Sequence, residues 1–178
     1  MVTLDQALAY LRDNCALEVI AATAWSVSDI RAYEAATGLK IPDQLRMVLM
    51  QVGHCGVESN DAFIVTHDDG SRSVHESQIL VSSRNSFMAM HQMFMKDDPW
   101  PNQFTLPMVF FGTADAGHSY LLMDGTNPEN GEVYFWERAT DPFGTGDNAK
   151  GVAKVADSLT EFFMKLTAPD KLQVAIAP

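Results

Sequence analysis

The patterns typical of helices and those typical of strands occur in separate blocks along this chain, and their order restricts the possible fold. Apolar residues at helical spacing dominate residues 3–52, whereas short apolar runs between turn residues dominate residues 62–66 and 107–137. One helical pattern, at residues 83–96, separates the two strand regions, and another follows the second of them. Because strands and helices do not alternate regularly, we predict an α+β fold with a central, mostly antiparallel sheet flanked by helices.

Capping signals indicate where the helices begin. Thr3 followed by Gln6 forms a capping box, and residues 158–161 form a second one before the last helical pattern. We expect Ser28 to cap a second helix. We expect Pro42 to occupy the first position of a third helix, where its missing N–H group has no cost.

Turn residues separate the predicted strands. We expect four of them, at residues 62–66, 107–111, 119–124 and 132–137. Residues 67–70 read as a turn, and the glycine, aspartate and asparagine between later strands favour antiparallel hairpins. Residues 17–25 fit either a buried strand or a linker, and residues 141–151 a surface loop. We predict a single domain over residues 1–167 and a C-terminal tail over residues 168–178.

Methionine is concentrated at residues 83–96, in a segment with a helical pattern. Methionine fills irregular gaps in cores and also suits adaptable binding surfaces. We expect core packing here, because methionine on a helix is usually buried. Pro99 and Pro101 end the segment as a helix.

The chain is acidic, with a formal net charge of −11 at pH 7. It has no Lys or Arg between Arg46 and Arg72, and none between Lys96 and Arg138. Such a surface repels phosphate backbones, which argues against direct nucleic-acid binding. It favours encounter with a basic partner, although an ordinary acidic soluble protein would show the same charge.

The segment GTADAGHS, residues 112–119, has the spacing of a phosphate-binding loop except that His118 replaces the lysine. Asp115 adds a negative charge to the loop, and a strand pattern follows it where a phosphate loop needs a helix. We therefore predict no nucleotide site. Gly112 and Gly117 are instead expected to supply positive φ angles in a connection between strands.

No other motif indicates catalysis, a cofactor or a metal. The histidines lack metal-ligand spacing, His54–Cys55 is not a dyad merely because the two are adjacent, and there is no G-x-S-x-G. Residues 124–129 read as a turn rather than a calcium loop. Cys15 and Cys55 are expected to be free thiols. Because the chain lacks a signal-peptide pattern and a membrane-length apolar run, we expect a cytoplasmic location.

Several segments, in order from about residue 28 to residue 166, resemble the SUKH superfamily. They are Ile30-x-x-Tyr-Glu34-x-x-x-Gly38-Leu-x-Ile-Pro42, Phe110-Phe-Gly112, Ala116-Gly-His-Ser-Tyr-Leu-Leu-Met-Asp124, Glu132-Val-Tyr-Phe135 and Val155-Ala-Asp-Ser-Leu159-x-x-Phe-Phe163. Two features depart from the family pattern. Gly53-His-Cys-Gly56 stands where the family often has Asn-Gly, and the segment between His75 and Pro107 is longer than the family core.

The resemblance implies an α+β binding module without catalytic residues. Many bacterial members resemble immunity proteins that neutralise toxins, often nucleases, and others act in the regulation of cell-wall assembly. We therefore expect a non-enzymatic immunity protein whose acidic surface binds a basic toxin. The alternatives are a regulatory or scaffold module of the same fold and a small hydrolase. The sequence does not determine the partner's identity or the oligomeric state.

The expected partner-binding residues lie in predicted turns and loops. The acidic candidates are Asp68, Asp69, Asp97, Asp98 and Asp115, and Trp100 is the candidate aromatic anchor. Trp100 would equally suit packing over the end of the methionine-rich helix.

Overall fold

The computed structural model describes residues 2–20, 23–57, 61–96, 104–138 and 151–176. The helices are α1 (Leu4–Asn14), α2 (Val27–Thr37), α3 (Asp43–Gln51), α4 (Arg84–Met95), α5 (Leu159–Lys165) and α6 (Pro169–Ile176). The strands are β1 (Leu17–Val19), β2 (Cys55–Val57), β3 (Ala62–Thr66), β4 (Arg72–Glu76), β5 (Ile79–Val81), β6 (Met108–Ala114), β7 (Ser119–Asp124), β8 (Val133–Glu137) and β9 (Val152–Ala156). A single 3-10 turn, η2 (Asp115–Gly117), joins β6 to β7.

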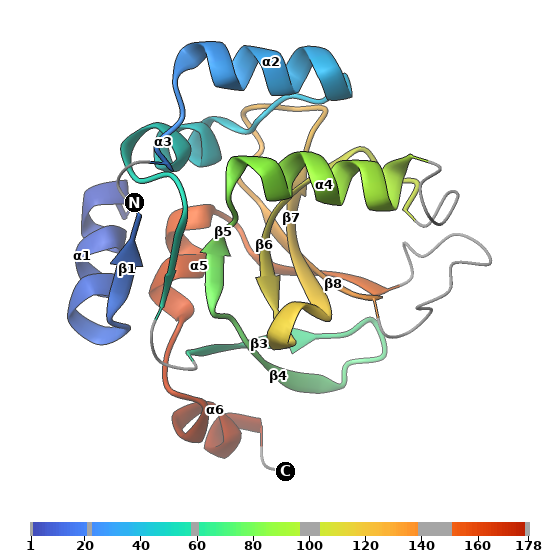
Figure 1. Cartoon of the computed structure of the whole chain (residues 1–178). Coiled ribbons are helices and arrows are strands. Elements are labelled where there is room, and N and C mark those ends of the chain that lie inside the picture. Colours follow the sequence, from blue (N-terminus) through green and yellow to red (C-terminus); the bar gives the residue numbers. More distant parts are fainter. Residues whose placement is uncertain (1, 21–22, 58–60, 97–103, 139–150, 177–178) are drawn as a thin grey trace.

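Seven strands form the main sheet in the order β1-β2-β5-β6-β7-β8-β9, and each neighbouring pair is antiparallel (Figure 1). Strands β3 and β4 form a separate two-stranded hairpin. The predicted α+β class and the antiparallel sheet are therefore confirmed. Every helix among the described residues is too short or too polar to cross a bilayer.

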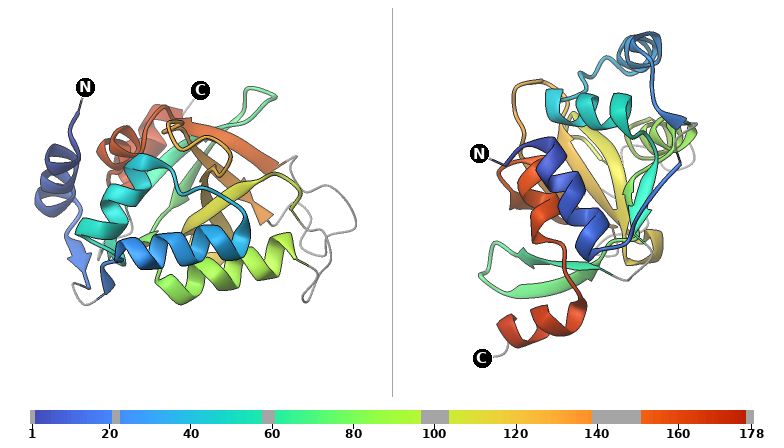
Figure 2. Two further views of the ribbon diagram at one scale, coloured as in Figure 1. Left: turned by 90° about the horizontal axis from the view of Figure 1, so that it is seen from above. Right: turned by 90° about the vertical axis from the view of Figure 1, so that its left-hand side faces the viewer.

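Helices cover both faces of the main sheet (Figure 2). Helix α4 packs on β6 with α2 beside it, whereas α1, α3 and α5 gather over the other face. Strands β6 to β8 are buried on both faces, so alternate side chains enter two different cores. The core under α4 is the smaller and is strongly aromatic: Met90, Phe94, Phe104, Met108, Phe110, Tyr120, Leu122 and Trp136.

The methionine-rich helix packs in the core, as predicted. Met90 is buried together with Phe87 and Phe94. Met88, Met93 and Met95 are partly buried and pack against the two cores. This segment therefore contributes to the fold rather than presenting an exposed methionine surface.

Two predicted helix starts differ from the structure by one or two residues. Ser26 rather than Ser28 caps α2, because Ser26 and Asp29 form a reciprocal capping box that satisfies two N–H groups. Pro42 is the N-cap of α3 rather than its first helical residue. The capping box at Thr3 is confirmed.

Several short elements had no clear sequence signal. Strands β2 and β5 have three residues each, which is too short to establish a period. Residues 17–25, left open between strand and linker, contain the edge strand β1. The expected C-terminal tail contains α6, which contacts both β3 and β4. Most of the expected surface loop at 141–151 lies outside the described residues.

Glu34 joins α2 to the start of α3. Its Oε1 accepts hydrogen bonds from the Ile41 N–H and the Arg46 guanidinium, both at 3.1 Å, and Lys40 Nζ lies 3.6 Å from Oε2. The side chain is only 13% exposed. Glu34 therefore has a structural role in the connection between the two helices.

We expect Glu34→Ala to lower the free energy of unfolding by about 1–3 kcal/mol, because it leaves the Ile41 N–H and the Arg46 guanidinium without their acceptor. Urea denaturation at pH 7 measures this loss. Glu18→Ala, at an exposed position of β1, is the control and should change stability by less than about 0.5 kcal/mol. Equal effects of the two variants would contradict the assigned role.

Candidate functional site

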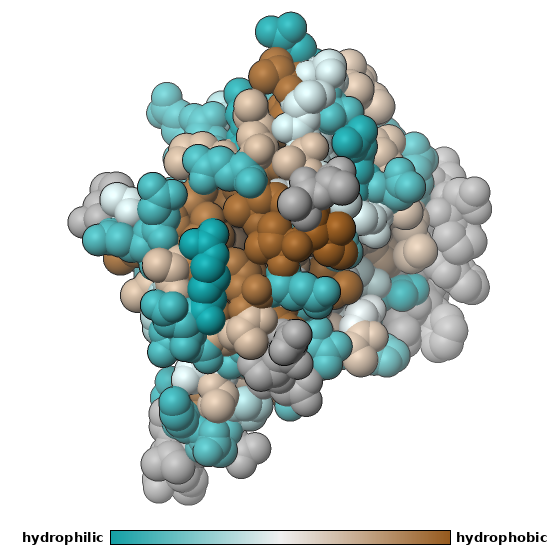
Figure 3. Space-filling view, turned by 60° about the vertical axis from the view of Figure 1, so that its left-hand side comes forward, coloured by the Kyte–Doolittle hydropathy of each residue, from teal (hydrophilic) through white to brown (hydrophobic). Residues whose placement is uncertain are grey.

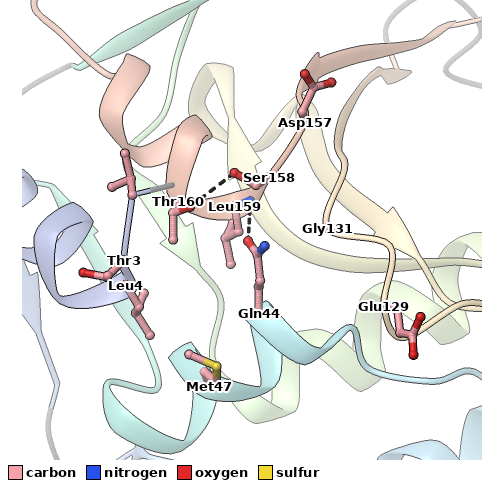
Figure 4. Close-up of a pocket in the computed structure, with 11 residues that line it drawn as sticks. Thr3, Leu4, Gln44, Met47, Glu129, Gly131, Asp157, Ser158, Leu159 and Thr160 are labelled. Carbon is pink, nitrogen blue, oxygen red and sulfur yellow. Dashed lines mark hydrogen bonds between the residues drawn. The ribbon is translucent and has the colours of Figure 1, made fainter.

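A groove of about 600 Å³ lies between the starts of α1 and α5, helix α3 and residues 129–131 (Figure 4). Its walls come from four segments that are far apart in the sequence. The groove is open to solvent on one side, and its lining is apolar at one end and acidic at the other.

The apolar end is formed by Val2, Leu4, Met47 and Leu159. Leu4 and Leu159 are buried beneath the surface, whereas Val2 is 39% exposed and Met47 is 47% exposed. Exposed aliphatic side chains beside a hollow can cover the carbon chain of an incoming residue. This end is therefore suited to an aliphatic group.

Gln44 forms the middle of the groove. Its Oε1 accepts a hydrogen bond from the Leu159 N–H at 2.9 Å, which joins α3 to the start of α5 (Figure 4). A Cβ atom at Gly131 would lie only 2.9 Å from Gln44 Nε2, so the absence of a side chain there leaves room for the amide. The groove floor is therefore fixed by contacts between three segments.

Two helix N-termini meet at the groove, and such termini ordinarily attract anions. Here some of these N–H groups already have acceptors within the chain. In α1 the Gln6 backbone N–H donates to the Thr3 hydroxyl, and the Thr3 backbone N–H donates to the side-chain carbonyl of Gln6. In α5 the Glu161 N–H donates to the Ser158 hydroxyl, and Leu159 donates to Gln44. These contacts reduce the attraction for an anion.

Carboxylates form the other end of the groove. Glu129 and Asp157 line it and are exposed, on the side away from Leu4 and Met47 (Figure 4). Lys154 lies next to Asp157, with Nζ 2.7 Å from Asp157 and 2.8 Å from Glu132. The carboxylates of Glu129, Glu132 and Asp157 therefore outnumber the single ammonium group of Lys154. Among the described residues, no Lys or Arg lines the groove.

The ion pairs around Lys154 shift the pKa values of their members. Hydrogen bonds to Asp157 and Glu132 raise the pKa of the Lys154 ammonium. Hydrogen bonds from Lys154 and Tyr134 lower the pKa of the Glu132 carboxyl. Lys154 and Glu132 therefore stay charged at neutral pH.

A second apolar surface lies outside the groove. Hydrophobic side chains gather on the face where α1 and β1 lie (Figure 3). Val19 and Ile20, at the end of β1, are exposed there. Exposed apolar patches of this kind are typical of surfaces that contact other proteins.

The structure does not bring the predicted partner-binding acids to the groove. Asp68 and Asp69 are exposed in the turn of the β3–β4 hairpin. There they line a separate hollow of about 240 Å³ with His67 and residues 151–153. Asp97, Asp98 and Trp100 lie outside the described residues, so their part in binding stays a prediction.

Asp115 is a half-buried member of a hydrogen-bond network. It accepts hydrogen bonds from His75 Nδ1 at 2.8 Å and from the Glu76 N–H at 3.2 Å. Burial would raise the pKa of the Asp115 carboxyl, but hydrogen bonds from His75 and Ser119 outweigh that effect and lower it. The Asp115 carboxylate is thus bound by other residues of the protein, and part of it remains exposed to solvent.

The turn around Asp115 differs from the expected glycine pattern. Gly117 has the predicted positive φ, at 88°, but Asp115 and Ala116 are also positive, at 52° and 55°. The expectation for Gly112 was wrong. Gly112 lies within β6, where a Cβ atom would be 2.7 Å from the Leu80 carbonyl oxygen, so glycine is needed there for close packing against β5.

Two other predictions concern cysteines and metals. Cys15 and Cys55 are free thiols, and both are buried. Burial raises the pKa of each thiol to about 12, so neither is a reactive thiolate at neutral pH. Among the described residues, no three His, Cys, Asp or Glu side chains converge as metal ligands.

An antiparallel α+β fold with an open groove, apolar at one end and acidic at the other, has the features of a protein-binding module. The SMI1 / KNR4 family (SUKH-1) matches residues 25–165, and the chain belongs to this family. No curated protein matched the chain. Family membership supports a binding module of the immunity or regulatory kind, and the family is generally non-catalytic.

Sequence reasoning missed the groove as a site. The Asp157–Ser158 pair was part of the recognised motif pattern, and Ser158 was predicted as a helix cap. Met47 and Glu129 carry no motif of their own. Only the packing of α3 and residues 129–131 against the start of α5 brings these residues together.

Proposed function

We propose that the chain is an immunity-type protein that neutralises a basic toxin by binding it at the groove. A lysine or arginine of the toxin would lay its carbon chain on Val2 and Met47. Its charge would lie between Glu129 and Asp157. The observation that supports this most is the groove itself, whose apolar end adjoins carboxylates while no cation of the described residues lines it.

The two ends of the groove would contribute differently. Apolar burial stabilises a complex by about 25 cal/mol per Å², so the carbon chain and its neighbours would supply most of the affinity. An exposed ion pair contributes only about 0–1 kcal/mol. The carboxylates would therefore select a basic side chain and speed its approach more than they would tighten the complex.

The other acids would act at longer range. The net charge of −11 gives the molecule an attractive field for a basic partner, and Asp68 and Asp69 extend this charge to the hairpin turn. Asp69 is fixed by hydrogen bonds from the Ser71 N–H and hydroxyl groups at 2.8 and 2.6 Å. We therefore assign Asp68 and Asp69 to steering rather than to the groove.

The salt dependence of association tests the steering. The association rate with the proposed toxin domain should fall about tenfold or more between 50 and 500 mM salt, because salt screens charges beyond about one Debye length. Stopped-flow or surface-plasmon measurements give this rate. A rate that does not change with salt would contradict steering but not binding at the groove.

The alternative is a regulatory or scaffold module of the same fold with no toxin partner. The gene neighbourhood distinguishes the two, because an immunity protein is expected beside a large multidomain toxin gene. The neighbouring toxin domain should then form a one-to-one complex in size-exclusion chromatography. If no such gene adjoins this one, the regulatory alternative is favoured.

A further inference from the structure

A continuous series of hydrogen bonds links four side chains at the β3–β4 hairpin: those of His67, Ser73, His75 and Asp115. His67 Nε2 lies 2.7 Å from Ser73 Oγ, which lies 2.7 Å from His75 Nε2. His75 Nδ1 in turn lies 2.8 Å from Asp115 Oδ2. A serine bonded to one histidine nitrogen, with a carboxylate bonded to the other, is the arrangement that activates serine nucleophiles.

The strand register explains how the hairpin residues meet. Ser73 and His75 are two residues apart on β4, so they share one face, opposite Val65 and Phe63 of β3. His67 follows Val65 by two residues and reaches Ser73 on that same face. The buried Phe63 and Val65 show that this face points into the protein.

His75 and Asp115, at one end of this series of hydrogen bonds, are held in place by their neighbours. The His75 ring packs against Phe135, with centroids 4.2 Å apart, and against Phe63 at 6.1 Å. Asp115 is fixed by the Glu76 N–H at 3.2 Å and by Ser119. Positioning of this kind keeps the histidine oriented toward Ser73.

The hydrogen bonds determine where the protons lie. The Asp115 carboxylate accepts a hydrogen bond, so His75 Nδ1 must carry a proton, and in the neutral ring Nε2 is then an acceptor. With His75 in this neutral form, Ser73 donates its hydroxyl proton to Nε2. Because the Ser73 hydroxyl has only one proton and donates it to His75, His67 Nε2 must be the donor in its hydrogen bond with Ser73 Oγ. Each side chain then donates to the next one in the order His67, Ser73, His75 and Asp115.

The geometry points to Ser73 as an activated nucleophile, with His75 as its general base and Asp115 as the positioning residue. The reacting partner would be a small acyl or phosphonyl electrophile. Ser73 is half-buried and does not itself line the 240 Å³ hollow at the hairpin turn, but its hydrogen-bond partner His67 does, so a small reagent would reach Ser73 past His67. Asp68 and Asp69 line the same hollow, so neutral or cationic reagents are favoured over anionic ones.

The reaction with a fluorophosphonate shows the step explicitly. Ser73 Oγ attacks phosphorus, an O–P bond forms, the P–F bond breaks and fluoride leaves. His75 Nε2 takes the hydroxyl proton and releases it to solvent. With an ester, the acyl group passes to Oγ, the alcohol leaves with the proton, and water later hydrolyses the acyl-serine.

Labelling of the intact chain with a neutral alkyl fluorophosphonate tests the inference, with the modified residue located by mass spectrometry. We expect Ser73 to be labelled fastest among the serines, and Ser73→Ala to abolish that label. Ser28→Ala, at an exposed position of α2, should leave labelling of Ser73 unchanged. Absence of a label on Ser73 in the wild-type chain would overturn the inference.

Asp115→Asn tests the role of the carboxylate. The asparagine carbonyl can still accept from the Glu76 N–H, but its NH₂ group would face His75 Nδ1 and force the proton to Nε2. We expect the labelling rate to fall about 100-fold, the scale of general-base catalysis. Long-range ¹H–¹⁵N spectra should show the change of His75 tautomer, which a merely structural role would not produce.

The thermal midpoint of Asp115→Asn provides the folding control. An unchanged labelling rate in a folded Asp115→Asn variant would overturn the assignment of His75 as base. This inference does not depend on partner binding at the groove, because Ser73, His75 and Asp115 do not line it. Failure of one proposal is therefore distinguishable from failure of the other.

Discussion

Replacing Trp136 by alanine is expected to lower the free energy of unfolding by about 3–5 kcal/mol, the range for a large aromatic residue removed from a packed core. Trp136 is fully buried in the small core under α4. Its ring centroid lies 5.2 Å from that of Phe94, 4.8 Å from Phe104 and 5.7 Å from Tyr120. Because rings surround it on several sides, the cavity cannot close without moving α4.

Urea denaturation monitored by circular dichroism measures this loss. Leu106→Ala is the control, since Leu106 is 37% exposed and its truncation should cost less than about 1 kcal/mol. A loss below about 1 kcal/mol for Trp136→Ala would contradict the described packing of α4 on the sheet.

Replacing Met47 by arginine is expected to weaken toxin binding at least about 30-fold, the effect of losing a contact worth 2 kcal/mol or more. The new side chain would fill the apolar end of the groove. Its guanidinium would also repel the basic residue that we place between Glu129 and Asp157. Because Met47 is 47% exposed, the fold should tolerate the change.

Met50→Arg is the matched control for this variant. Met50 lies three residues along the same helix and is 41% exposed, but it does not line the groove. Both variants change the net charge equally, so long-range electrostatics alone would affect them alike. Isothermal titration calorimetry with the toxin domain should show weak binding for Met47→Arg and nearly wild-type binding for Met50→Arg. Equal affinities would exclude the groove as the contact.

Much of the fold follows from local signals in the sequence. Capping side chains and apolar spacing indicate the first five helices, because the helical period repeats several times within each segment. The three-residue strands β2 and β5 give no such repeat. Their position depends on Gly56 and Gly112, which allow close backbone contact with Gln78 and with residues 79–80.

The candidate sites were harder to predict, because each depends on contacts between distant segments. The spacing of Ser73 and His75 places them on one face of a strand, but nothing in the sequence shows that Asp115 reaches His75 from 40 residues away. In the groove, Met47 and Glu129 come together only through the packing of Gln44 against Gly131 and α5. Acidic composition alone indicated the kind of partner but not the surface.

Neutralisation of the proposed toxin domain tests the central claim most directly. Its activity would be measured while wild-type chain, Met47→Arg and Met50→Arg are titrated in separately. We predict that the wild-type chain and Met50→Arg abolish the activity near one equivalent, whereas Met47→Arg requires a large excess. Full activity in the presence of excess wild-type chain, or equal neutralisation by all three, would contradict an immunity function carried by the groove.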